Sequence, residues 1–157
     1  MQIVQMERPE EKMRVVRYIL ESLPTWFEQT EGREQYIRES AEQICLCAYE
    51  EEKPIGFVCL KETGKATVEL AVMGVLEEYH RSGIGRKLVL QAKQIAYAKG
   101  YSFLQVKTVQ MGVYEDYDRT NRFYLALGFQ EFEAFPTLWD EANPCQIYVM
   151  ALEKNYG

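Results

Sequence analysis

The sequence has 157 residues, enough for one compact domain with a full core, and we expect a single domain over residues 1–157. Hydrophobic residues make up 47% and charged residues 27%, values typical of a soluble globular protein rather than of a disordered chain. Eighteen Lys and Arg against 24 Asp and Glu give a net charge of −6, which argues against nucleic-acid binding. No apolar run reaches the roughly 18 residues that a membrane-spanning helix needs, so we expect no membrane partner.

The first half of the chain predicts strands and two helices. Residues 1–7 form a first strand, and Pro9 opens a helix to about Ser22, with apolar residues at helical spacing. A second amphipathic helix is expected within the acid-rich stretch Glu28–Glu42. Polar turns then separate three runs of β-forming residues, which we expect to pair as antiparallel strands: Ile44–Tyr49, Ile55–Leu60 and Thr67–Val75.

The second half changes to helical periodicity at Ile84, and Gly100 occupies the position of a helix C-terminal cap. A polar, tyrosine-rich loop is expected after the next strand. The further predicted elements are a strand over Tyr101–Val109, a short helix over about Thr120–Leu127, and strands over Phe129–Phe135 and Gln146–Leu152. This order predicts the α/β (α+β) class, with a mixed, mostly antiparallel sheet flanked by helices.

The four cysteines, Cys45, Cys47, Cys59 and Cys145, show no CxxC spacing, and the chain has a single histidine. We therefore expect neither a metal site nor a disulfide framework. The N-terminal residues do not resemble a signal peptide, because no basic patch precedes an apolar core. Together these features predict a cytoplasmic protein.

The basic residues are unevenly distributed. Residues 79–114 hold six basic residues and no acid, whereas the rest of the chain holds 12 basic and 24 acidic residues. Such an island predicts a local anion site, although a chance run on a solvated helix face explains the charges as well.

The segment His80–Lys87 lies between a predicted strand and a long helix, where unpaired backbone N–H groups and the helix dipole favour anions. Gly83 and Gly85 allow a sharp turn and a close approach of the backbone to a ligand. The segment is no Walker loop, and no complete dinucleotide fingerprint, because Leu88 occupies the third glycine position. We expect a phosphate site here; a glycine-containing turn with no ligand is the alternative.

The stretch Met73–Gly85 resembles the acetyl-CoA motif of the GNAT superfamily of N-acetyltransferases. That motif is Q/R-x-x-G-x-G/A, five residues after a valine that closes the fourth strand, here Val75. His80 stands at the Gln/Arg position, a departure for which Arg81 compensates. Thr120–Phe129 resembles the family's later helix, with a tyrosine four residues before Gly-Phe. The resemblance extends over residues 44–152 and implies an acyl-CoA N-acyltransferase-like fold.

The resemblance implies acetyl-CoA as cosubstrate and direct transfer of its acetyl group to a primary amine of a small molecule, peptide or protein. The amides of residues 81–86 would hold the pyrophosphate, and the backbone at Met73 and Val75 would pair with the pantetheine arm. An amide near Gly74 or Val75 would stabilise the oxyanion. A glycine at 74 would also permit a bulge that separates this strand from its parallel neighbour; a packing glycine or a simple strand end is the alternative. The implied cofactor-binding residues are Met73, Gly74, Val75, His80, Arg81, Ser82, Gly83, Ile84, Gly85, Arg86, Lys87, Asn121 and Tyr124.

Two catalytic residues are implied. Tyr124 matches the usual general acid for the thiolate, since a phenol with an ordinary pKa of about 10 can protonate a thiol of pKa about 8.5. Its alternative is a buried structural tyrosine. Glu69 is the best candidate for the base, and an exposed strand residue is its alternative. The acids Glu115, Asp116 and Asp118 would attract a cationic amine at the mouth of the site or form a solvated charge run.

Two classes of function remain open. The first is the N-acetyltransferase, and the second is a non-catalytic acyl-CoA-binding or sensing domain; a nucleotide-binding module is disfavoured. The acceptor is not identified by the sequence, and homodimerisation is left open. Aromatic residues are expected to line the acceptor side: Trp26, Phe27, Tyr36, Tyr114, Tyr117, Phe135 and Trp139.

Overall fold

The structure is a computed structural model that describes residues 1–23 and 30–153. The chain forms two compact units. The first contains Met1–Lys61 and Ala71–Ile95, and the second contains Glu62–Leu70 and Ala96–Gly157. The expected single domain over residues 1–157 therefore stays a prediction, and the two units are described one at a time.

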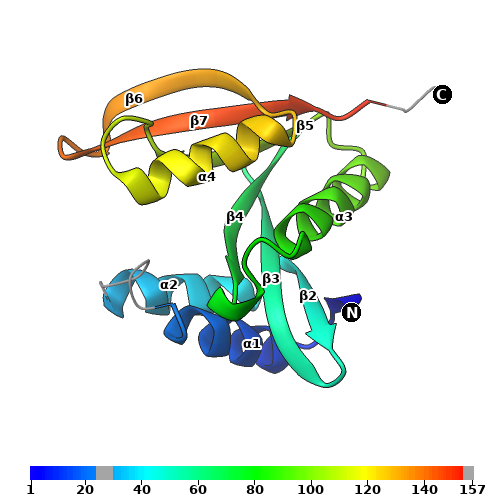
Figure 1. Cartoon of the computed structure of the whole chain (residues 1–157). Helices are drawn as coiled ribbons and strands as arrows, with labels where there is room; N and C mark the ends of the chain where they lie inside the picture. Colours follow the sequence, from blue (N-terminus) through cyan, green and yellow to red (C-terminus); the bar gives the residue numbers. More distant parts are fainter. Residues whose placement is uncertain (24–29, 154–157) are drawn as a thin grey trace. The chain divides into compact units, whose positions relative to one another are not determined.

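The first unit contains three antiparallel strands, β1 (Gln2–Met6), β2 (Ile44–Glu50) and β3 (Lys53–Glu62). Helices α1 (Pro9–Glu21) and α2 (Thr30–Ser40) lie side by side (Figure 1), and Arg17 of α1 binds Glu34 of α2 at 2.8 Å. Strand β4 (Thr67–Val75) ends in this unit, followed by the short 3-10 helix η1 (Glu77–Tyr79) and by α3 (Ile84–Ala98).

The core of the first unit follows from its apolar pattern. Val16, Ile19 and Leu20 lie at helical spacing on α1 and are fully buried. Residues 45–48 of β2 and 55–60 of β3 are buried without alternation, which is typical of strands covered on both faces.

In the second unit, β5 (Phe103–Val109) pairs antiparallel with β7 (Asn143–Ala151), and β7 pairs antiparallel with β6 (Gln130–Asp140). The first residues of β4 pair in parallel with β5, as Thr67–Glu69 against Phe103–Gln105. Helix α4 (Glu115–Ala126) packs on the sheet through Tyr124, whose ring centroid lies 6.3 Å from that of Tyr148 on β7.

The strand order β1-β2-β3-β4-β5-β7-β6, with a parallel β4–β5 pair, confirms the predicted mixed, mostly antiparallel sheet with helices. None of the helices in the described residues is long and apolar enough to cross a membrane.

Two boundaries differ from the sequence-based prediction by five residues, more than the others do. The helix expected from Thr120 begins at Glu115, so the expected tyrosine-rich loop is shorter. Acids in its first turn favour that start through the helix dipole, and the Asp118 carboxylate accepts a hydrogen bond from the Gly112 amide at 2.7 Å. Strand β6 continues to Asp140 rather than ending at Phe135. Its residues are mostly exposed, so the sequence contains no apolar alternation from which the end of the strand could be predicted.

Candidate functional site: the turn before α3 and the other predicted site residues

The turn between β4 and α3 has an unusual backbone. Arg81 and Gly83 both adopt positive φ, at 65° and 85°. A glycine enters this left-handed region at little cost, whereas an L-residue such as Arg81 is strained in it. Left-handed residues next to right-handed ones form backbone concavities that bind anions. A Cβ added at Gly83 would meet no atom within 4 Å, so the space beside this residue is open.

The hydrogen bonds of this turn leave a group of donors unused. Amides that donate to carbonyls within the turn are those of Tyr79, His80 and Ser82. The first bond of α3 runs from the Lys87 amide to the Gly83 carbonyl at 3.1 Å. Within the described part of the chain, the amides of Arg81 and of residues 83–86 donate to no acceptor. They form a cluster of N–H donors at the positive end of a helix, which suits an anion.

Three cationic residues belong to the same turn and the first turn of α3. Arg81, Arg86 and Lys87 are exposed, and over residues 1–23 and 30–153 none of the three forms an ion pair. Their charges are therefore free for a ligand. Ile84 and Ser82 contribute differently: the Ile84 side chain is buried, and the Ser82 hydroxyl donates to the Tyr79 carbonyl within the turn.

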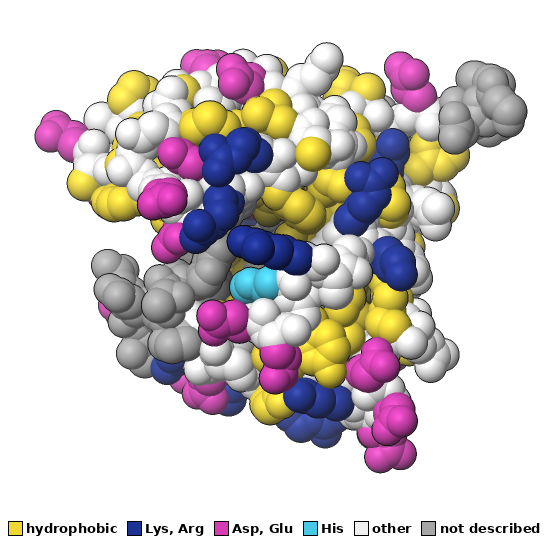
Figure 2. Space-filling model, in the orientation of Figure 1, with side chains coloured by type: hydrophobic (Ala, Val, Ile, Leu, Met, Phe, Trp, Pro, Cys, Tyr) yellow, Lys and Arg dark blue, Asp and Glu magenta, His cyan; other side chains and the backbone are white. Residues whose placement is uncertain are grey.

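The histidine of the turn lies at the surface (Figure 2), where its ring bonds to the protein itself. His80 Nε2 lies 2.7 Å from the carbonyl oxygen of Val75. The side chain expected at the Gln/Arg position of the motif thus binds the end of β4.

The end of β4 presents its backbone in a defined direction. The Leu76 amide donates to the Ile55 carbonyl on β3 at 2.9 Å. Because N–H and C=O of a trans peptide point in opposite directions, the Val75 carbonyl points away from β3. The N–H and C=O groups of one strand residue share a side and successive residues alternate. Met73 and Val75 therefore direct both groups away from β3, whereas Gly74 directs its groups toward it.

Gly74 has a packing role. A Cβ at this position would lie 3.1 Å from both Ile19 Cγ2 on α1 and Phe57 Cε1 on β3, so a larger residue would require these two side chains to shift by a few tenths of an ångström. The ladder between β4 and β5 ends at Glu69–Gln105, well before Gly74. The close contacts favour the packing alternative for Gly74, and its expected role at the cofactor stays a prediction.

Glu69 belongs to the second unit and is only 9% exposed, which contradicts its interpretation as an exposed strand residue. Its Oε1 atom accepts hydrogen bonds from Lys107 Nζ at 2.9 Å and Gln105 Nε2 at 3.0 Å. Elsewhere among the described residues, Oε2 has no hydrogen-bond partner. The carboxylate is thus oriented by two donors on β5 and keeps one oxygen available.

Tyr124 is buried near the end of α4, with its ring edge-to-face against Phe129 at 5.6 Å and Phe123 at 5.4 Å. Burial raises the pKa of the phenol well above its usual range. The raised pKa keeps the hydroxyl protonated, but it also makes Tyr124 a weaker acid than an exposed tyrosine.

Asn121 has a structural position that the sequence did not reveal. Its side chain is fully buried, and Nδ2 donates to the carbonyls of Val109 at 2.9 Å and Tyr117 at 2.6 Å. Its Oδ1 accepts a hydrogen bond from the Tyr148 hydroxyl at 2.5 Å. With these groups already paired inside the protein, Asn121 connects α4 to β5 and β7, which favours a structural role; its expected contact with the cofactor stays a prediction.

The acids expected at the mouth of the site belong to the first turn of α4. Asp116 pairs with Arg119, and Asp118 holds the Gly112 amide. Two of these three acids therefore have partners within the chain, which favours a local structural role.

The aromatic residues expected on the acceptor side are dispersed. Tyr114 and Tyr117 flank the start of α4, whereas Phe135 and Trp139 belong to β6 and not to a loop. Tyr36 lies on α2. Trp26 and Phe27, also expected there, lie outside the described residues.

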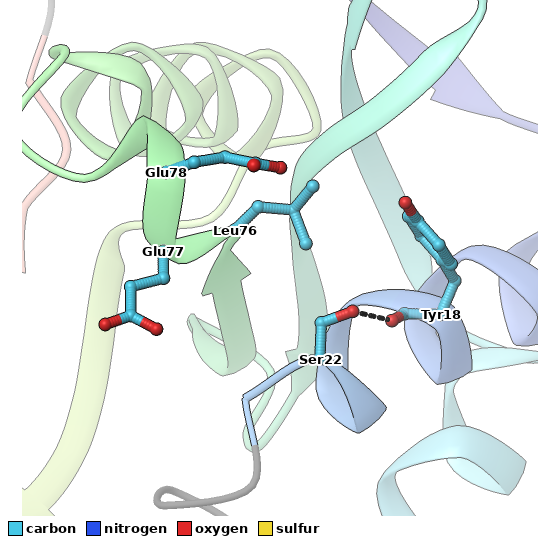
Figure 3. Close-up of a pocket in the computed structure, with 5 residues that line it drawn as sticks. All are labelled: Tyr18, Ser22, Leu76, Glu77 and Glu78. Atoms are coloured by element: carbon cyan, nitrogen blue, oxygen red, sulfur yellow. Dashed lines mark hydrogen bonds between the residues drawn. The ribbon is translucent and has the colours of Figure 1, made fainter.

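A hollow of about 430 Å³ in the first unit lies beside the turn (Figure 3). It is lined by Tyr18, Ser22, Leu76, Glu77 and Glu78. Glu78 binds Lys53 at 2.9 Å, and the Ser22 hydroxyl donates to the Tyr18 carbonyl. No motif marks Tyr18 or Ser22 as part of such a hollow, and the two carboxylates make it unsuitable for a phosphate.

The fold has clear structural relatives. A GNAT-family protein of Desulfovibrio desulfuricans is similar over 97% of this chain and 99% of its own, with 20% identity and a TM-score of 0.85. An aminoglycoside 6'-N-acetyltransferase complexed with coenzyme A is similar over 100% of both chains, with 17% identity and a TM-score of 0.75. A Salmonella typhimurium protein, solved with its cofactor acetyl-CoA, is similar over 99% of this chain and 96% of its own, with 15% identity and a TM-score of 0.71. The fold is therefore that of the acyl-CoA-dependent acetyltransferases.

The sequence identifies the family directly. A model of the acetyltransferase (GNAT) family matches residues 12–129, and the chain belongs to that family. The resemblance drawn from the two motifs is confirmed, as is the expectation of an acetyltransferase. The search of curated proteins gave no match.

Proposed function

We propose that this protein transfers the acetyl group of acetyl-CoA to a primary amine of a small molecule, peptide or protein. The observation that carries the proposal is the set of amides at Arg81 and residues 83–86, at the N-terminus of α3, together with Arg81, Arg86 and Lys87; none of these groups has a partner among residues 1–23 and 30–153. A pyrophosphate supplies oxygen acceptors and negative charge for these donors. The acetyl-CoA bound by the Salmonella typhimurium neighbour supports the same ligand here.

The strand end fits the rest of the cofactor. Met73 carries an N–H and a C=O on the side of β4 away from β3, and Val75 carries an N–H there while its carbonyl is bound by His80. A pantetheine arm has amide groups that can pair with the free groups as an added strand. The Val75 amide is then the better candidate for the oxyanion donor, because the Gly74 amide is directed toward β3.

The proposed reaction is a direct displacement. The amine nitrogen attacks the thioester carbonyl, the C–N bond forms, and the Val75 amide stabilises the oxyanion. The C–S bond then breaks and releases the coenzyme A thiolate. Glu69 would take the proton from the amine through Oε2, while Lys107 and Gln105 hold Oε1. Tyr124 would give a proton to the thiolate.

A covalent acetyl-enzyme on cysteine is disfavoured. All four cysteines are free and buried. Burial raises the pKa of Cys47 to about 12 and that of Cys145 to about 11. Near neutral pH neither thiol is ionised to a useful extent, and the thiolate is the nucleophilic form.

The alternative is a domain that binds acyl-CoA without transferring the acyl group. The burial of Tyr124 favours it, since a phenol with a raised pKa is a poorer acid for a thiolate. The two functions share the cofactor site and differ in turnover.

We further propose that residues 1–157 act as one N-acetyltransferase domain in the cytoplasm. The family model supports a single domain, because its matched residues 12–129 draw on both compact units. The four free cysteines suit a reducing compartment.

The experiment is an amine screen. The protein is incubated with acetyl-CoA and a panel of polyamines, aminoglycosides, amino-acid amides and peptides with free N-termini or lysines. We expect release of free thiol and an acetylated product detected by mass spectrometry with at least one amine. Binding of acetyl-CoA in calorimetry without turnover on any amine would favour the sensing domain, and absence of binding would contradict both functions.

A further inference from the structure

The bond between His80 and Val75 connects the start of the turn to the end of β4. His80 Nε2 lies 2.7 Å from Val75 O. A carbonyl oxygen can only accept, so Nε2 carries the proton and donates it. In a neutral imidazole the other nitrogen, Nδ1, is then an acceptor, which repels a phosphate oxygen. In the neutral ring, the only N–H donor is thus used by the Val75 carbonyl and does not face an anionic ligand.

The accepting carbonyl lies on the ligand-facing side of the strand. Val75 O points away from β3, because the Leu76 amide of the same peptide unit binds Ile55 on β3. An extended ligand that added to this edge would meet both polar groups of Val75, its N–H and its C=O. His80 binds the Val75 carbonyl and leaves the Val75 N–H as the free donor nearest the end of β4.

We propose that His80 is a positioning residue that caps the Val75 carbonyl and so directs the thioester oxygen of the cofactor to the Val75 amide. The cap removes an acceptor that would compete for the amides of the pantetheine arm, and this fixes the register of the arm. The imidazole N–H also offsets the negative end of the Val75 carbonyl dipole, close to where the oxyanion forms. The inference rests on the proposed acetyl-CoA site.

Three variants of His80 separate this role from a contact with phosphate. His80→Ala removes ring and donor, His80→Phe keeps a ring without the donor, and His80→Gln keeps an N–H donor. Each variant is titrated with acetyl-CoA and with S-acetylpantetheine, which lacks the pyrophosphate and the nucleotide. The Val75 amide signal is followed by NMR, and Arg81→Ala is the comparison for loss of a phosphate contact.

Capping predicts that the Ala and Phe variants bind both ligands about fivefold more weakly, because the uncovered Val75 carbonyl then lets the pantetheine arm pair in a wrong register; this factor corresponds to about 1 kcal/mol. The Gln variant should bind both nearly as the unchanged protein does. In turnover with an amine found by the screen, KM for acetyl-CoA should rise and kcat should fall together in the Ala and Phe variants. Arg81→Ala should weaken acetyl-CoA alone.

Loss of acetyl-CoA affinity in His80→Ala with unchanged S-acetylpantetheine affinity would overturn the proposal, because it would show a phosphate contact. Equal defects in His80→Gln and His80→Phe would overturn it as well, since the donor would then not matter. If the unchanged protein binds neither ligand, the acetyl-CoA site itself fails. That result differs from every outcome in which only the His80 variants change.

Discussion

The N-termini of α3 and α4 carry opposite charges beside the positive end of the helix dipole. The first turn of α4 carries Glu115, Asp116 and Asp118, negative side chains that compensate the positive end of the helix. The first turn of α3 carries no acid. It holds Arg86 and Lys87, so the chain adds positive charge where the dipole is already positive.

The hydrogen bonds show the same difference. Close to α4, the Gly112 amide is held by Asp118, and the polar groups of Asn121 are paired inside the protein. Before α3, the amides of Arg81 and residues 83–86 have no acceptor among the described residues. A region that satisfies its own polar groups is built for stability. One that leaves donors and cations unmatched is less stable without a ligand and is suited to binding one.

Gly83→Asp is the most direct test of whether the unused amides at the start of α3 bind a ligand. The substitution adds a Cβ where φ is 85° and places a carboxylate beside the unused amides. We expect acetyl-CoA binding to fall by more than about 100-fold, measured by calorimetry, because the new carboxylate competes for the donors and repels phosphate.

Gly100→Asp is the matched control. Gly100 follows the other end of α3, has φ of 93°, and likewise has no atom within 4 Å of an added Cβ. It should lose similar stability and keep acetyl-CoA affinity. Equal loss of affinity in the two variants would show that strain rather than ligand contact accounts for the effect.

The next largest effect concerns Tyr124, which determines whether the second unit takes part in the chemistry. As a general acid, Tyr124→Phe should lower kcat by about 100-fold at nearly unchanged acetyl-CoA affinity. An ordinary tyrosine has a pKa of about 10, and burial raises the pKa of Tyr124 above that value. The phenol therefore stays protonated at pH values up to about 10, and its ionisation should not reduce kcat in that range. A structural tyrosine predicts a lower melting temperature with normal kcat per folded molecule, and that result would favour acid catalysis by another group.

Asn121→Ala tests whether the paired polar groups around α4 contribute to stability rather than to ligand binding. The substitution leaves the Tyr148 hydroxyl and the Val109 carbonyl without their buried partner, a loss of about 2–3 kcal/mol in the free energy of unfolding. Urea denaturation should show this loss, whereas acetyl-CoA affinity per folded molecule should not change. Arg122→Ala, at the exposed neighbouring position, should change neither quantity. Weaker acetyl-CoA binding by folded Asn121→Ala would instead support a contact of Asn121 with the cofactor.

Local signals in the sequence were sufficient for the turn but not for Asn121. The glycine pair, the basic residues and the preceding strand are contiguous, so the turn and the bounds of β4 at Thr67 and Val75 could be predicted. Asn121 depends on Val109 and Tyr148, and Glu69 depends on Lys107. Those partners are distant in the chain, and only the pairing of strands brings them together.

The smallest predicted effect is also the most specific. Arg86 lies in the first turn of α3, where a cation opposes the helix dipole, so Arg86→Ala should leave the melting temperature unchanged or raise it slightly. The same change should weaken acetyl-CoA binding about tenfold, because one charge facing the phosphates is lost, and should leave S-acetylpantetheine binding unchanged. Lys99→Ala removes an equal charge beyond the other end of α3 and should affect neither ligand. Opposite signs for stability and affinity at one residue are what a charge kept for a ligand predicts. A lower melting temperature with equal losses for both ligands would instead show that Arg86 supports the fold.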